Sequence, residues 1–260
     1  MSVLLLTATI NSGYFGNVGT LIKDYDERKQ QYISTLTRYI CDSKFDRIVF
    51  AENSNESLDE EYFYELARVH GKKIEFLSLP GDKKKMQEQG KSYGEAKLIY
   101  DAFSTSVLIR DEDAIYKVTG RVYVENINKL INERVENNFT AHNFVSWVLT
   151  SFFKIRKDDY FEFFQNTPQL SNDNTPNYEW CIEHVYFETL KNVKHPIKSF
   201  RCYPDLRGIN SGSNAPYTKS KKAIFLRNIL TKFNWFKFDP KPKKVYKLIN
   251  YAQTLKKKLR

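Results

Sequence analysis

Short apolar runs separated by longer amphipathic segments constrain this chain more than any other feature. Residues 3–9, 47–51 and 114–118 are each dominated by apolar side chains, without the alternation of a strand that has one face in water. Strands that are apolar on both faces are typical of a parallel sheet covered by helices. Between the first two runs, residues 26–40 carry apolar side chains at helical spacing. The sequence therefore predicts an α/β, Rossmann-like fold with a mostly parallel sheet flanked by helices.

The same patterns predict the remaining elements. A helix at residues 58–70 and a strand at 73–79 continue the strand–helix repeat. The second half is expected to contain a helix at 127–136, one or two antiparallel strands within 142–154, and helices at 158–164 and 178–188.

The stretch from residue 90 to residue 126 carries the clearest signs of a ligand site. Residues 90–95 (GKSYGE) have the composition of a basic, glycine-flanked loop that opens onto a helix, and a helix N-terminus attracts anions. The strand at 114–118 ends in Thr119-Gly120-Arg121, where Gly120 would let the backbone approach a ligand and where Lys117 and Arg121 add positive charge. Both loops also occur in α/β proteins without a ligand role. Together they predict a diphosphate-bearing substrate.

Charge divides the 260-residue chain into two parts. Residues 218–260 hold 14 Lys and Arg and one acidic residue, which gives +13 and leaves −3 for residues 1–217. We expect a domain at 1–217 and a basic, aromatic-rich helical tail at 218–260. Basic helices with Trp and Phe on one side suit an anionic membrane surface. Nucleic acid binding and simple packing on the body are the alternatives for this tail.

The cysteines and the N-terminus indicate a cytoplasmic setting. Cys41, Cys181 and Cys202 show neither metal-ligand spacing nor a paired framework, as expected of a reducing compartment. The apolar run at residues 3–6 lacks a preceding basic segment and is too short for a signal peptide, so a buried strand is expected there. No membrane-spanning segment is expected.

Several of these segments together resemble a known family. They are residues 6–10 (LTATI), Arg28, residues 49–54 (VFAENS), residues 90–95, residues 116–121 (YKVTGR) and Ile182-Glu183. Over roughly residues 1–217, this combination resembles bacterial glycosyltransferases of surface-polysaccharide biosynthesis with a GT-A type fold, the group that includes galactofuranosyltransferases of O-antigen and capsule clusters. The resemblance implies sugar transfer from a nucleotide-sugar donor, a UDP-hexose such as UDP-galactofuranose, to a lipid-linked saccharide.

The pathways that the resemblance implies are capsule, O-antigen and lipooligosaccharide synthesis, on the cytoplasmic, inner face of the plasma membrane. The tail at 218–260 would then hold the enzyme peripherally on that membrane. The runner-up hypothesis is a nucleic-acid-binding α/β protein that uses the tail as its basic contact surface.

The resemblance also implies site residues. The donor-binding residues would be Thr7, Thr9, Arg28, Asn53, Lys91, Tyr93, Gly94, Lys117, Thr119, Gly120 and Arg121. For Arg28, a solvated arginine in the first turn of a helix is the alternative. An inverting transfer needs a base to accept the proton of the acceptor hydroxyl, and the resemblance implies a carboxylate for this role. Glu183 is the first candidate and Glu179, one helical turn earlier, the second; solvated glutamates are the alternative.

Metal dependence is not expected. Asp111-Glu112-Asp113 fits the Asp-x-Asp metal motif of GT-A enzymes, but it precedes its strand, so an acidic surface turn is the favoured interpretation. Lys117, Arg121 and Lys91 would neutralise the leaving diphosphate in place of a cation. Mn²⁺ or Mg²⁺ held by Asp111 and Asp113 remains the alternative.

Overall fold

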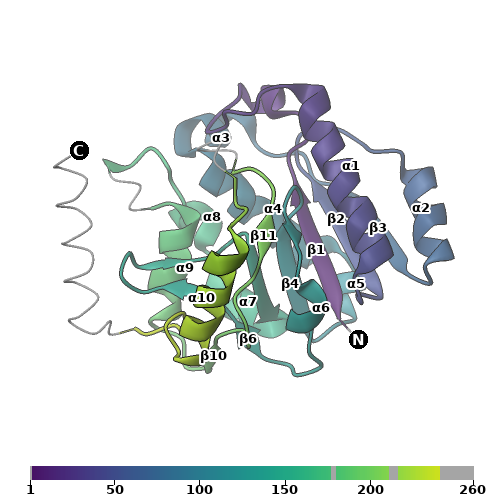
Figure 1. The fold of residues 1–260 in the computed structure, drawn as a ribbon. Coiled ribbons are helices and arrows are strands. Elements are labelled where there is room, and N and C mark those ends of the chain that lie inside the picture. Colours follow the sequence, from purple (N-terminus) through teal and green to yellow (C-terminus); the bar gives the residue numbers. More distant parts are fainter. Residues whose placement is uncertain (1, 177–179, 211–215, 241–260) are drawn as a thin grey trace.

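The computed structural model describes residues 2–176, 180–210 and 216–240. In these ranges seven strands form the main sheet, in the order β10-β6-β9-β4-β1-β2-β3 (Figure 1). The strands of this sheet are β1 (Val3–Ala8), β2 (Arg47–Glu52), β3 (Lys73–Ser78), β4 (Ala114–Thr119), β6 (Asn137–Asn138), β9 (Phe152–Arg156) and β10 (Ile197–Lys198). Two-stranded pairs are formed by β5 (Tyr123–Val124) with β11 (Leu206–Arg207) and by β7 (Ala141–His142) with β8 (Trp147–Val148).

The sheet is mostly parallel, which confirms the predicted fold class. β1 pairs in parallel with β2 on one side and with β4 on the other, and β2 pairs in parallel with β3. β9 runs antiparallel to β4 and to β6. The four strands expected in the first half of the chain are thus present, and each ends within one residue of its predicted end.

Helices cover both faces of the sheet. They are α1 (Tyr25–Asp42), α2 (Glu60–Val69), α3 (Lys83–Gln89), α4 (Lys91–Thr105), α5 (Val107–Arg110), α6 (Ile127–Leu130), α7 (Lys157–Phe164), α8 (Thr167–Leu170), α9 (Ile182–Leu190), α10 (Lys221–Lys232) and the 3-10 helix η1 (Ser12–Phe15). Figure 1 shows α1 and α2 beside the strands of the N-terminal half, and α8, α9 and α10 grouped beside the C-terminal half.

Alternate residues of β1 pack into two separate cores. Leu4 and Leu6 join a cluster with Leu36 of α1, whereas Val3 and Leu5 join a cluster with residues of α4 and α9. All six residues of β1 are buried, as expected of a central strand that is apolar on both faces. The continuous apolar run therefore follows from burial on both sides.

Three predicted elements differ from the structure, and one of them is the helix predicted at 178–188, which begins at Ile182 in α9. The predicted loop at residues 90–95 is mostly helical, because α4 begins at Lys91 and Gly90 caps it with a positive φ of 85°. The predicted helix at 127–136 ends with α6 at Leu130, since Ile131 is extended and the backbone of Asn132 bonds the Tyr116 hydroxyl and the Lys154 ammonium group. At residues 131–136, long-range bonds therefore override the local helical pattern.

The described part of the predicted tail packs on the body. Phe236 and Phe238 are buried, and the Ala141 amide donates to the Phe236 carbonyl at 2.9 Å. The Asn143 side chain donates to the Lys237 carbonyl at 2.7 Å. Residues 241–260 of the predicted tail lie outside the described residues, and the domain boundary at 217 stays a prediction. Among the residues that the structure describes, no helix is long and apolar enough to cross a membrane.

Candidate functional site

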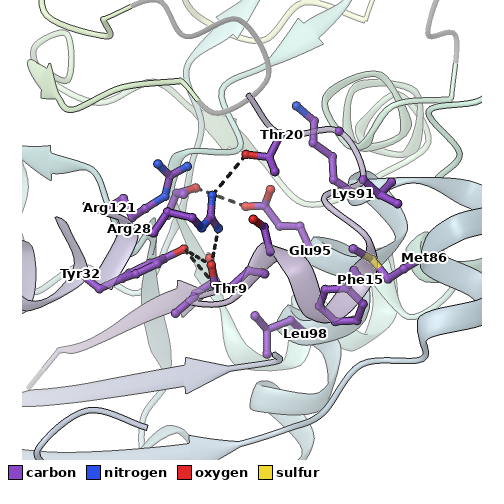
Figure 2. Close-up of a pocket in the computed structure, with 16 residues that line it drawn as sticks. Thr9, Phe15, Thr20, Arg28, Tyr32, Met86, Lys91, Glu95, Leu98 and Arg121 are labelled. Atoms are coloured by element: carbon purple, nitrogen blue, oxygen red, sulfur yellow. Dashed lines mark hydrogen bonds between the residues drawn. The ribbon is translucent and has the colours of Figure 1, made fainter. Parts of the chain in front are cut away.

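The main pocket lies where the strand order reverses. Chain order runs outward from β1 through β2 and β3 on one side, and β4 follows on the other. In open α/β sheets, the crevice beyond the carboxyl ends of such strands is the usual ligand site. A cleft of about 650 Å³, counted with its solvent-open mouth, lies there (Figure 2). Six predicted donor-binding residues line it: Thr7, Thr9, Arg28, Lys91, Thr119 and Arg121.

Arg28 is fixed in the wall of this pocket by backbone carbonyl groups. The residue is only 3% exposed, so the solvated-arginine alternative is wrong. Its Nε donates to the Ile10 carbonyl at 3.1 Å, and Nη1 donates to the Ile22 carbonyl and to the Thr20 hydroxyl, both at 3.2 Å. Nη2 donates to the Thr9 carbonyl. These bonds hold the guanidinium at the carboxyl end of β1 without neutralising its charge.

Arg121 places a second guanidinium next to the first. The two side chains lie side by side in Figure 2. Arg121 is 6% exposed and donates from Nη1 to Gln31 at 2.9 Å, while its buried Nε has no hydrogen-bond partner. Burial, and to a smaller degree the charge of Arg121, lowers the pKa of Arg28. Within the described ranges neither guanidinium has an ion-pair partner, so the pair is suited to bind an anion.

Glu95 and Lys117 form an ion pair at the base of the pocket. Lys117 is fully buried, and its ammonium group donates to Glu95, to the Thr150 carbonyl at 3.0 Å and to the Thr119 hydroxyl at 3.2 Å. Glu95 lines the pocket, whereas Lys117 does not. In this arrangement Lys117 holds Glu95 in place and does not face the space where a diphosphate would bind.

Glu183 lies beside Glu95, in the first turn of α9. Its Oε1 accepts a hydrogen bond from the Thr150 hydroxyl at 3.2 Å. Burial raises the pKa of Glu183, and the negative charge of Glu95 raises it further, against the opposing effect of Lys91. Thr150 thus binds Glu183 with its hydroxyl group and Lys117, the partner of Glu95, with its carbonyl group. Glu179, the second candidate, lies outside the described residues.

Other predicted donor-binding residues have structural contacts instead of a place in the pocket wall. The side chain of Asn53 accepts from the Thr9 hydroxyl at 2.7 Å and so orients it. Tyr93 packs with Phe15 and Met86 in a small apolar cluster. A Cβ atom at Gly94 would lie 2.0 Å from the Met86 sulfur, so Gly94 serves the packing of α3 on α4.

Gly120 also has a structural reason to be glycine. Its amide donates to the Thr7 carbonyl at 2.8 Å, and an added Cβ atom would lie 2.8 Å from that same oxygen. The structure thus shows a close backbone approach of Gly120 to β1, and its predicted role in donor binding stays a prediction.

The N-terminus of α4 is already capped. The Ser92 amide donates to an Asp173 carboxylate oxygen at 2.9 Å, and the Ser92 hydroxyl donates to the other oxygen. An anion bound at this helix end would have to displace Asp173. The positive charge that Lys91 adds to the pocket comes from its exposed side chain, which is part of the lining.

Two acidic groups lie at the opposite edge of the sheet. The turn with Asp111 and Asp113 precedes β4, and its Glu112 pairs with Arg47 at 3.1 Å. Separately, Asp159, Glu162 and His195 have ligand atoms within 4.8 Å of one another, which is compatible with a divalent cation. Asp159 follows the end of β9, and that end pairs with the start of β4. Both groups are thus remote from the pocket beyond the carboxyl ends of β1 and β4.

Sequence reasoning missed three side chains of the site. Glu95 is the last residue of the glycine-flanked segment at 90–95, but no local sequence pattern indicates its ion pair with Lys117. Tyr32 lies one turn after Arg28, and its hydroxyl accepts from the Thr9 amide at 2.9 Å. Thr20, which binds Arg28, lies in a loop without periodicity. Only the helical spacing of Arg28 and Tyr32 offered a signal for any of these.

Comparisons with known proteins give distant structural likenesses. No family model matches this chain, and no curated protein sequence matches it. An active-site mutant of the galactosyltransferase LgtC superposes with a TM-score of 0.43 and 10% identity, over 73% of this chain and 70% of that one.

Two further solved structures are similar to the same extent. A Desulfovibrio desulfuricans protein named as a nucleotide-diphospho-sugar transferase gives a TM-score of 0.41 with 11% identity, over 75% of this chain and 78% of that one. A Bacillus anthracis protein named as a glucose-1-phosphate thymidylyltransferase gives 0.42 with 10% identity, over 89% and 94%. Likenesses of this size assign neither a family nor a reaction to this chain. The proposed function is therefore argued from the geometry of the site.

Proposed function

We propose that this protein is a glycosyltransferase that transfers a sugar from a nucleotide-sugar donor to a saccharide acceptor. The observation that carries the proposal is the pair of buried guanidinium groups, Arg28 and Arg121, without ion-pair partners in the described ranges, next to the carboxylates of Glu95 and Glu183. The guanidinium pair is suited to bind a diphosphate, and a carboxylate can accept the proton of an acceptor hydroxyl.

The cations would bind the diphosphate and stabilise it as it leaves. As the bond between the sugar and the diphosphate breaks, negative charge increases on the diphosphate oxygens. Arg28 and Arg121 are already oriented by their bonds to Ile10, Ile22 and Gln31, so little reorganisation is needed at that moment. Lys91, which lies on the other side of the pocket, can add a third positive charge.

Glu183 is the general base in this proposal. A carboxylate is a more effective base when its pKa is raised toward neutrality, and burial beside Glu95 has that effect on Glu183. Because Glu95 is ion-paired with Lys117, the two neighbouring carboxylates have different environments. A base on the acceptor side of the donor sugar corresponds to an inverting transfer.

The finer proposals follow the resemblance described above. They are a GT-A type enzyme that uses a UDP-hexose, with UDP-galactofuranose as one candidate, and a lipid-linked acceptor of capsule, O-antigen or lipooligosaccharide synthesis. Peripheral attachment to the inner face of the plasma membrane is supported by α10, on which Phe225 is 67% exposed close to Lys221 and Lys222. The runner-up hypothesis, nucleic acid binding through the tail, gains no support from the residues that line the donor pocket.

We propose that a metal ion is not required, because Arg28, Arg121 and Lys91 can supply the positive charge that a metal ion would otherwise provide to the diphosphate. Activity should persist in EDTA, and replacing Asp111 and Asp113 with Ala should have little effect. Activity that disappears with chelator and returns with Mn²⁺ would overturn this part of the proposal.

A donor screen tests the proposed function. The full chain is incubated without acceptor with UDP-, GDP- and CMP-sugars, and release of the nucleoside phosphate is measured. Slow hydrolysis of at least one donor is expected, because water can replace the acceptor hydroxyl. Absence of both hydrolysis and binding for every donor would contradict the proposal.

A further inference from the structure

A second pocket is lined by residues of the C-terminal half of the chain. Its volume is about 490 Å³ with its open mouth, and it lies between β7, β11, the segment before α10 and the middle of α10. The side chains that define its chemistry are His142, Tyr203, Tyr217, Lys219 and Arg227. The donor pocket shares none of these residues.

The walls of this second pocket are aromatic and positively charged. The Arg227 guanidinium lies 4.7 Å from the centroid of the Tyr203 ring and 6.0 Å from that of Phe236, so stacking on two rings holds it in place. Lys219 adds a second cation, and no Asp or Glu lines the pocket. In the part of the chain that the structure describes, neither Lys219 nor Arg227 has a carboxylate partner. Two such cations are suited to an anionic ligand.

His142 adds a neutral polar group to this wall. Burial, together with the charges of Arg227 and Lys219, lowers the pKa of His142 to about 4. The imidazole is therefore uncharged at neutral pH and can exchange hydrogen bonds with hydroxyl groups. A neutral ring beside aromatic walls is suited to a sugar, which presents both hydroxyl groups and apolar C–H faces.

Tyr217 connects this pocket to the proposed reaction centre. Its hydroxyl lies 3.2 Å from the Ser151 hydroxyl, and the preceding residue, Thr150, donates to Glu183. Glu95 and Glu183 both act electrostatically on the Tyr217 phenol. The charge of Arg121, which lines the donor pocket, also acts on this phenol, so a ligand that lies against Tyr217 would be close to the proposed reaction centre.

We propose that the second pocket binds a saccharide that carries a phosphate group, with the phosphate at Lys219 and Arg227 and the sugar ring against Tyr217. Identification of this ligand as the acceptor rests on the proposed function. Binding of a sugar phosphate by these residues does not, so the two can be tested separately.

The test uses glucose 1-phosphate as the probe and the full chain with Arg121→Gln, so that the donor pocket contributes less to binding. In this background, titration calorimetry should show that glucose 1-phosphate binds at least tenfold more tightly than glucose or inorganic phosphate. Adding Lys219→Gln or Arg227→Gln should weaken binding at least tenfold. The matched control, Lys222→Gln, changes an exposed lysine of α10 outside the pocket and should leave affinity unchanged.

Because Arg227 packs on two rings, its replacement can disturb the fold, whereas the Lys219 side chain has no such packing. Circular dichroism of each variant therefore accompanies the titrations, and Lys219→Gln alone is decisive. Unchanged affinity in a folded Lys219→Gln protein would overturn the proposal, as would equal affinity for inorganic phosphate. If the wild-type protein bound no nucleotide sugar but this lysine still determined sugar-phosphate binding, the proposed function would fail and the pocket assignment would stand.

Discussion

At the scale of single residues, Arg121 is the most direct test of the donor pocket. It is buried, contacts Gln31 through Nη1 and has a free Nε. Replacing it with Gln removes a charge from the diphosphate site but few contacts of the fold. We expect kcat/KM to fall by the equivalent of about 2–4 kcal/mol, with little change in Tm. Arg68→Gln, at an exposed arginine of α2, is the control; kinetics for Arg121→Gln that match this control would remove Arg121 from the site.

Lys117 has a different expected effect, because it is fully buried and paired with Glu95. Lys117→Met leaves that carboxylate without its cation and should destabilise the fold by about 3 kcal/mol, the lower end of the range for broken buried pairs, because Glu95 is partly exposed. Lys117→Met combined with Glu95→Gln should recover much of this stability but not the activity. Chemical denaturation measures the first effect and turnover the second. A double variant no more stable than Lys117→Met would contradict the assigned pairing.

Glu183 should determine the acidic side of the pH profile. Its pKa is raised, and a base acts only when it is deprotonated, so kcat/KM should rise with pH through a value above 4.5, the ordinary pKa. Glu183→Gln should lower kcat by about 10²–10⁴-fold and remove this acidic limb. If Glu183→Gln still shows the fall in kcat/KM at low pH, a different group must be responsible for it.

The raised pKa of Glu183 also has a consequence for stability. A raised pKa means that the folded state favours the protonated carboxyl group. This contribution to the free energy of unfolding is fully present below the unfolded-state pKa and is lost as pH rises through the folded-state value. The stability of the wild type relative to Glu183→Gln should therefore decrease over that window.

At the scale of elements, the packing of α3 on α4 depends on Gly94. A Cβ atom there would lie 2.0 Å from the Met86 sulfur, so Gly94→Ala should cost about 1–3 kcal/mol in the free energy of unfolding. Met86→Ala makes room for the new methyl group. The double variant should therefore lose less free energy of unfolding than the sum of the losses in the two single variants. A simple sum of the two costs would mean that the clash is relieved elsewhere.

The strands could be predicted from the sequence, but the helix ends near the site could not. The runs in β1, β2 and β4 are apolar because both faces are buried, which is a local and readable pattern. The start of α4 depends on Asp173, 81 residues away from Ser92, and no periodicity signals that bond. Arg121 could be predicted because it belongs to a local segment, Thr119-Gly120-Arg121. That Lys117 does not line the pocket could be seen only from the three-dimensional structure, because its partner Glu95 comes from another element.

At the scale of the whole molecule, the basic tail contains two parts with different expected roles. Residues 218–240 include the buried Phe236 and Phe238, so deletion from residue 218 should destabilise the body. Residues 241–260 hold eight Lys and Arg and no acidic residue. At roughly 1 kcal/mol for each basic residue near an anionic leaflet, their deletion should strongly weaken binding to such membranes, with α10 retained, while turnover on a soluble acceptor remains. Liposome co-sedimentation at low and high salt is the measurement; equal binding by the protein lacking 241–260 would contradict a membrane role for this segment.

The central claim is that a donor diphosphate binds between Arg28 and Arg121, at the carboxyl ends of β1 and β4. The most direct measurement is a crystal structure of the full chain with UDP, both with and without added Mn²⁺. The diphosphate oxygens should lie within hydrogen-bond distance of both guanidinium groups in either condition. A diphosphate bound instead beside Asp111 and Asp113, or beside Asp159 and His195 at the opposite edge of the sheet, would contradict the account.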